Sequence, residues 1–109
     1  SAERLATRIG DIISQVKKIK PQANIYLLEI PMTIFRVDCD NHAIKGINKI
    51  ILSGELKNSH GDSVTYTPIQ LNEYLVNSFG KLAIEFTEDG LNLNEKGYTL
   101  IQQIILQTL

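Results

Sequence analysis

Few side chains of this sequence could do chemistry, and most of them lie in predicted loops. The string Gly61-Asp62-Ser63 places a serine hydroxyl close to His60, and a second histidine is His42. We interpret the string as a turn, because glycine, aspartate and serine are common turn residues and a strand is predicted directly after it. His42 and His60 are interpreted as exposed polar side chains rather than as catalytic bases.

Cys39 lies between Asp38 and Asp40, which makes this stretch the nearest approach to a metal-ligand cluster. No group of His, Cys and Asp has the spacing of a known metal site, so we predict a loop here. We therefore expect neither a bound metal nor another cofactor. One cysteine also excludes a disulfide within the chain.

Asp89 and Asn92 form the most informative pair, three residues apart in a loop ahead of a predicted final helix. A carboxylate at the first position could orient a catalytic partner at the second. An amide, however, cannot accept and return a proton near neutral pH.

The string from Thr87 to Tyr98 resembles the C-terminal signature of the SGNH (GDSL-type) hydrolases, D-G-x-H-x-N-x-x-G-Y. The shared residues are Asp89, Gly90, Asn94, Gly97 and Tyr98. Upstream, the order of helix and strand elements is also similar, including Asn41, Ile44, Ile47 and Asn48 in an N-x-x-I-x-x-x-N helix. The resemblance covers the whole chain but only the second half of a family domain.

This resemblance implies a Ser-His-Asp acyl-ester hydrolase in which a serine attacks the acyl carbonyl and a histidine takes its proton. Asp89 would be either the retained family aspartate or only a cap of its own loop, and Asn92 occupies the position of the family histidine. That loss would cost about a thousandfold or more in rate. Gly61-Asp62-Ser63 matches the start of the family's nucleophile motif, but it precedes a predicted strand, whereas the family motif opens a helix.

Two function classes follow from the resemblance. The chain is either the C-terminal portion of an esterase or acylhydrolase, itself lacking nucleophile and base, or an inactive family relative that serves in binding or assembly. In the first case the substrate would be an acyl-ester small molecule or an acylated sugar, once an N-terminal half completes the domain. The chain alone is predicted to be inactive.

Alternating helices and strands are predicted to position these residues. Leu5, Ile9, Ile12, Ile13, Val16 and Ile19 form one apolar helix stripe, capped by Ser1 and ended by Pro21. Further elements are a strand over 24–30, a helix from Asp40 or Asn41 through Ile51 toward Leu56, a strand over 64–67 stopped by Pro68, a short helix over 71–79 and a final helix from Asn94. This order indicates an α/β fold, part of a three-layer, flavodoxin-like arrangement with a parallel sheet.

Two parallel strands are too few for a stable sheet of this kind, so the sheet is predicted to be incomplete. The apolar strand over 24–30 would keep a bare edge, which proteins rarely leave exposed. Either a missing segment or another copy of the chain supplies further strands. We therefore expect the isolated chain to form a homo-oligomer.

Length and charge limit the number of domains and the classes of partner that the chain can have. A chain of 109 residues with 43% hydrophobic and 21% charged residues fits one domain over 1–109. The net charge of -1 offers no cationic excess for a nucleic-acid partner. No apolar run approaches the roughly 20 residues of a membrane span. No signal peptide is visible, and the cellular compartment stays open.

Overall fold

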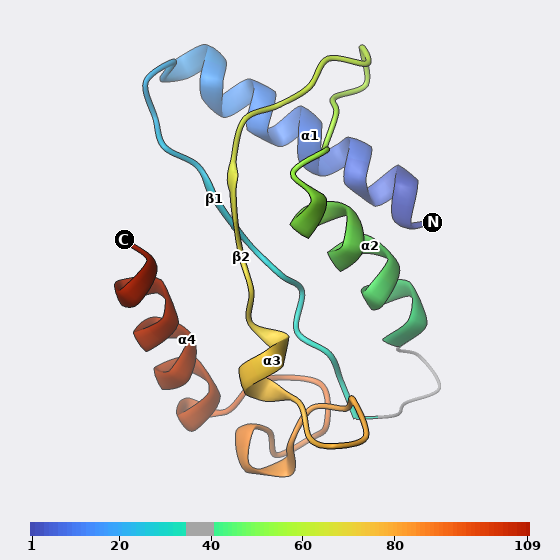
Figure 1. The fold of residues 1–109 in the computed structure, drawn as a ribbon, viewed down its shortest axis with the longest axis vertical. Coiled ribbons are helices and arrows are strands. Elements are labelled where there is room, and N and C mark those ends of the chain that lie inside the picture. Colours follow the sequence, from blue (N-terminus) through green and yellow to red (C-terminus); the bar gives the residue numbers. More distant parts are fainter. Residues whose placement is uncertain (35–40) are drawn as a thin grey trace.

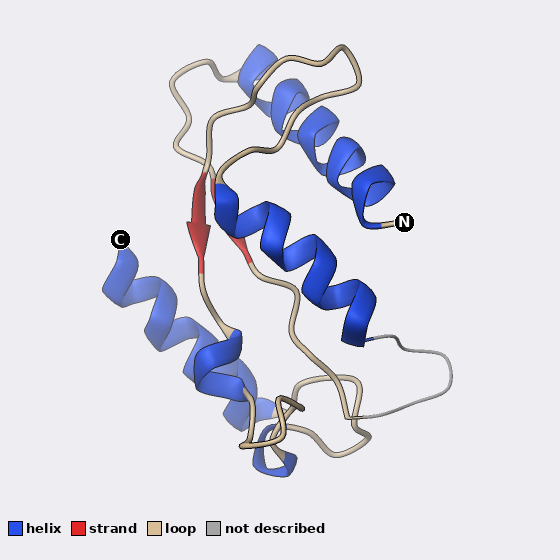
Figure 2. Cartoon of the chain, turned by 45° about the vertical axis from the view of Figure 1, so that its right-hand side comes forward, coloured by secondary structure: helices blue, strands red, loops and turns tan. Residues whose placement is uncertain are grey.

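The computed structural model describes residues 1–34 and 41–109. Two short parallel strands run between helices, with α1 and α2 on one side and α4 on the other (Figures 1 and 2). The elements are α1 (Ala2–Ile19), β1 (Tyr26–Leu28), α2 (Asn41–Ser53), β2 (Thr67–Ile69), α3 (Asn72–Leu75), the 3-10 helix η1 (Ile84–Phe86) and α4 (Glu95–Thr108). The predicted α/β class with a parallel sheet is confirmed.

The sheet pairs β1 with β2 in parallel, with Tyr26 opposite Thr67 and Leu28 opposite Ile69. Both strands are shorter than predicted, and Pro68 lies inside β2 instead of ending it. The pairing explains why. The amide of Thr67 donates to the Ile25 carbonyl at 2.8 Å, and the Ile69 carbonyl accepts from Glu29 at 3.0 Å. Hydrogen-bonding direction alternates along a strand, so Pro68 faces away from β1 and its missing N–H removes no pairing bond.

The predicted starts of the first two helices agree with the structure. The Ser1 hydroxyl accepts from the Arg4 amide at 3.3 Å and caps α1, and α2 begins at Asn41. The alternative start at Asp40 lies outside the described residues. The helix predicted over 71–79 is only the single turn α3. Val76 instead bridges to Leu82 around a turn in which Gly80 has a φ of 74°.

Two apolar clusters form the core. One lies between α1 and α2 and contains Ala6, Ile13, Ile47, Ile51 and Leu56. The other joins the sheet, α3 and α4 and contains Ile69, Leu71, Leu75, Leu82, Phe86 and Ile104. Gly10 allows the first cluster to close, since a Cβ there would lie 2.1 Å from the Lys57 carbonyl oxygen.

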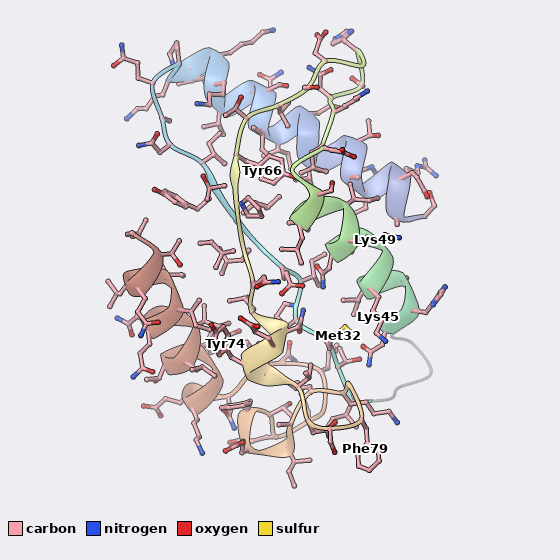
Figure 3. All side chains as sticks on the ribbon, in the orientation of Figure 1. Met32, Lys45, Lys49, Tyr66, Tyr74 and Phe79 are labelled. Carbon is pink, nitrogen blue, oxygen red and sulfur yellow. The ribbon has the colours of Figure 1, made fainter. Side chains whose placement is uncertain are left out.

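The apolar stripe predicted on the first helix is only partly buried, and α4 also exposes an aromatic side chain. Ile12 and Ile19 on α1 are 64% and 78% exposed, and Tyr98 on α4 is 60% exposed. Phe79 projects from the end of the molecule near α3, as Figure 3 shows. Apolar periodicity marks a face that can be buried, and the described residues do not cover all of these faces. No helix in the described part of the chain is long and apolar enough to cross a membrane.

Candidate functional site

The loop ahead of α4 is organised around the carboxylate of Asp89. Its Oδ1 accepts from the backbone amides of Leu91 and Asn92 at 2.9 and 2.8 Å, and its Oδ2 accepts from the Asn92 side-chain amide at 2.9 Å. The structure therefore brings the two predicted site residues together. Asn92 acts as a donor to the carboxylate, which is a role that its amide can fill without proton transfer.

These donors stabilise the ionised form of Asp89. The amide N–H of Asn92 is the largest cause of the lowered pKa of this carboxyl, followed by the amide of Leu91 and the side chain of Asn92. A carboxylate whose pKa lies far below neutrality is a weak proton acceptor. Its strength is as a fixed negative charge and as a hydrogen-bond acceptor.

Thr87 and Gly90 fix the shape of the same loop. The Thr87 hydroxyl donates to the Asn92 carbonyl at 2.6 Å and accepts from the Gly90 amide at 2.9 Å. Gly90 has a φ of 82°, in the left-handed region that favours glycine, and its carbonyl accepts from Ile34 at 2.8 Å. The glycine of the string is thus required by backbone conformation.

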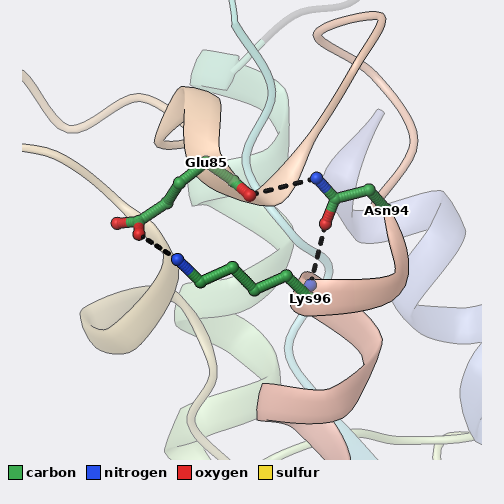
Figure 4. A network of polar contacts seen from close by, with 4 residues as sticks. Glu85, Asn94 and Lys96 are labelled. Carbon is green, nitrogen blue, oxygen red and sulfur yellow. Dashed lines mark hydrogen bonds and ion pairs between the residues drawn. The ribbon is translucent and has the colours of Figure 1, made fainter.

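The remaining residues of the string start α4. The Asn94 side chain caps the helix, accepting from the Gly97 amide at 2.9 Å and donating to the Glu85 carbonyl at 3.0 Å (Figure 4). Lys96 pairs with the Glu85 carboxylate at 2.8 Å, although both side chains are exposed. Gly97 lets α4 approach the 3-10 helix, since a Cβ there would lie 3.0 Å from the Phe86 carbonyl oxygen.

A groove of about 550 Å³ adjoins this loop at the carboxyl end of β1. Apolar side chains dominate its wall, and no Lys, Arg or His contributes to it. The lining residues are Leu28, Glu29, Ile30, Pro31, Thr33, Ile44, Leu71, Leu91, Asn92, Leu93, Tyr98 and Ile101. Such a surface suits an apolar occupant and offers no side-chain cation to a phosphate.

Sequence reasoning missed a buried polar network where β1 ends. Asn48 accepts from the Ile30 amide and donates to the Ile30 carbonyl, both at 2.8 Å. Asn72 donates to the same carbonyl at 3.0 Å and accepts from Met32 at 2.8 Å. Glu29 is 8% exposed and accepts from the amides of Leu71 and Asn72 at 2.8 and 3.0 Å. Asparagines on the apolar face of a predicted helix were the available signal.

The other sequence candidates lie elsewhere or outside the described chain. The turn carrying His60 and Ser63 packs beside α1, at the opposite end of the molecule from the Asp89 loop (Figure 1). Its turn conformation is confirmed, because Lys57 bridges to Ser63 and Gly61 has a φ of 82°. Cys39, with Asp38 and Asp40, lies outside the described residues. Across residues 1–34 and 41–109, no three His, Cys, Asp or Glu side chains are grouped to hold a metal.

Comparison with known proteins finds a sequence relative and a structural neighbour of this chain. No family model matches the chain. It is 32% identical over 93 residues to the N-acylneuraminate cytidylyltransferase of Escherichia coli O18:K1:H7 (strain RS218 / NMEC), a match covering 84% of this chain and 20% of that protein. The chain thus spans about a fifth of the length of its curated relative.

A structural neighbour is a Streptococcus pneumonia protein provisionally described as a platelet activating factor. It superposes with a TM-score of 0.78 at 20% sequence identity, over 98% of this chain and 51% of the neighbour. At that identity the likeness establishes the fold alone. The chain therefore has the architecture of about half of a known α/β protein.

The expected function is wrong. The relative is a cytidylyltransferase, which overturns both the SGNH/GDSL assignment and the expected esterase or acylhydrolase activity. The alternative of an inactive member of that family falls with it. The physical reason is that local structure accounts for much of the string: Asp89 binds loop amides, Gly90 has a positive φ, and Asn94 caps a helix.

Proposed function

We propose that this chain is an α/β segment of a protein related to the N-acylneuraminate cytidylyltransferases, and that it supports formation of the sugar nucleotide without carrying out the transfer. The observation that carries the proposal is the match of 32% identity over 93 residues, which takes in most of this chain and a fifth of the relative. The other four fifths of such a protein would hold the transfer site.

The side chains that line the groove favour a role for this chain other than catalysis of the transfer. Transfer of a cytidylyl group from a nucleoside triphosphate requires cationic groups that hold the phosphates and neutralise charge in the transition state. The groove beside Asp89 is lined by apolar side chains with Glu29 and Asn92, and none of its residues is cationic. An anionic triphosphate would meet the ionised Asp89 nearby, which disfavours binding there.

A replacement experiment tests this proposal. In the E. coli relative, the matching stretch of 93 residues would be either deleted or replaced by this chain. Pyrophosphate release from CTP and an N-acylneuraminate measures the transfer. We expect the deletion to lose soluble, active enzyme, the replacement to retain it within about threefold, and the isolated chain to show no release above background.

Matched variants control for folding. Leu75 is fully buried and Tyr74 is 52% exposed, although the two are neighbours in α3. In the replacement protein, Leu75→Asp should cause the same loss of soluble, active enzyme as the deletion, because it buries a charge in the core. Tyr74→Asp should leave the replacement protein as active as its parent. Transfer by the isolated chain, or full activity of the deleted enzyme, would overturn the proposal.

A further inference from the structure

The two outer edges of the sheet differ in their capacity to accept another strand. On β2, Pro68 faces outward and offers no amide, which is typical of an edge that stays unpaired. On β1, the carbonyl of Ile25 and the amide of Glu29 point toward β2, so the backbone groups of Tyr26 and Leu28 point outward. Within the described residues these outward groups have no backbone partner.

The open edge is continuous with the apolar groove. Leu28 belongs to β1 and also lines the groove, together with Ile30, Leu71 and Ile101. A strand placed along β1 would therefore gain backbone hydrogen bonds from the edge and apolar contacts from the residues that follow it. Asn48 already satisfies the backbone of Ile30 and limits the pairing to the stretch before it.

The structural neighbour indicates where such a strand comes from. This chain matches it almost completely, yet about half of the neighbour has no counterpart here. Sheets of parallel strands are normally covered on both faces and contain more than two strands. The exposed apolar side chains of Ile12, Ile19 and Tyr98 are further surface that such a half could cover.

We propose that β1 is an internal strand of a larger sheet, paired along Tyr26 and Leu28 with a parallel strand from an α/β segment outside these 109 residues. The occupant is an apolar, β-branched strand followed by polypeptide that fills the groove. A second copy of this chain is the competing occupant. A two-fold axis through the edge would pair β1 with itself in the antiparallel sense, so the two occupants differ in strand direction. The inference rests on the sheet edge and the fold, independently of cytidylyl transfer.

Hydrogen exchange at the two outward amides tests the pairing. The probe is the E. coli relative carrying this chain in place of its matching stretch, compared with the isolated chain, each at several concentrations. Paired amides exchange only when the strand opens, so we expect exchange at Tyr26 and Leu28 to be at least about 100-fold slower in the replacement protein. Equal exchange in both proteins would overturn the inference. Protection that grows with the concentration of the replacement protein would assign the edge to a second copy and overturn the inference equally.

A pair of variants separates the backbone from the side chain. Tyr26→Pro removes the outward N–H, whereas Tyr26→Ala removes the same partly exposed ring and keeps the N–H. In the replacement protein we expect the proline variant to melt about 5 °C or more below the alanine variant, and in the isolated chain the two should melt together. Identical melting in the replacement protein would refute the pairing. Loss of transfer activity with the amides still protected would count against the proposed function only.

Discussion

Replacing Asn48 with alanine should destabilise the junction between β1 and α2. Asn48 is 5% exposed, and its side-chain amide acts as a backbone substitute for Ile30, with one accepted and one donated hydrogen bond of 2.8 Å. Removal of the amide leaves the Ile30 N–H without this acceptor. The Ile30 carbonyl keeps its bond from Asn72 at 3.0 Å. Loss of the Asn48 side chain should therefore cost more free energy at the Ile30 N–H than at the Ile30 carbonyl.

The expected magnitude follows from that difference. A buried amide left without a partner costs about 1–3 kcal/mol. The small cavity adds to this cost, and the better helix propensity of alanine offsets about 0.5 kcal/mol of it. We expect Asn48→Ala to lower the free energy of unfolding by about 2 kcal/mol. For a chain of this length, that is a drop in Tm of about 8 °C.

Urea unfolding followed by far-UV circular dichroism measures the change. Lys49→Ala is the matched control, since it alters the next, exposed residue of α2 and should change stability by less than about 0.5 kcal/mol. A second alanine at Asn72 should cost more in the Asn48→Ala background than alone, because the Ile30 carbonyl then loses its last side-chain donor. An Asn48→Ala protein as stable as the control, or additive effects in the double variant, would refute this account of the network.

Two further predictions concern helix packing and the Asp89 loop. Gly10→Ala should destabilise the fold by about 3 kcal/mol or more, because its Cβ would lie 2.1 Å from the Lys57 carbonyl oxygen. Gly46→Ala, whose Cβ would lie 3.4 Å from that of Ala2, should be neutral or stabilising by up to about 1 kcal/mol. Urea unfolding that gives the two variants the same stability would contradict this. The pKa of Asp89 is lowered in the folded chain, so its contribution to stability is present above the unfolded pKa of about 4 and is lost as the pH falls below it. Between about pH 5 and pH 2, the Tm of the parent should therefore fall more steeply than that of Asp89→Asn, and parallel curves would exclude this linkage.

Local signals predicted the elements well where a few neighbouring residues decide them. Ser1 and Asn94 cap α1 and α4 as their types indicate, and the stretch around Gly61 is a turn. Such features depend on side-chain and backbone bonds within four residues, which any sequence displays directly. The helix predicted over 71–79 is shorter in the structure because a bridge between Val76 and Leu82 ends α3, and pairing across a turn is weakly encoded in the sequence.

The candidate site shows the limit of a local motif. Asp89 and Asn92 were predicted as a pair, and the structure joins them at 2.9 Å, but as carboxylate and amide donor within one loop. A loop that precedes a helix can favour the residues of this string for its conformation alone, without a catalytic role. Its function depends on groups from other elements, and those are decided by packing rather than by spacing.

The sequence by itself determined the α/β order, the caps of the first and last helices and the apolar faces, because each depends on periodicity or on contacts within a turn or two. Tertiary structure alone decided which faces are covered, how Asn48 and Glu29 are satisfied, and that Pro68 can lie within a strand. Those outcomes depend on which backbone groups meet across the sheet and between helices. Such meetings join residues far apart in the chain, and no local pattern specifies them.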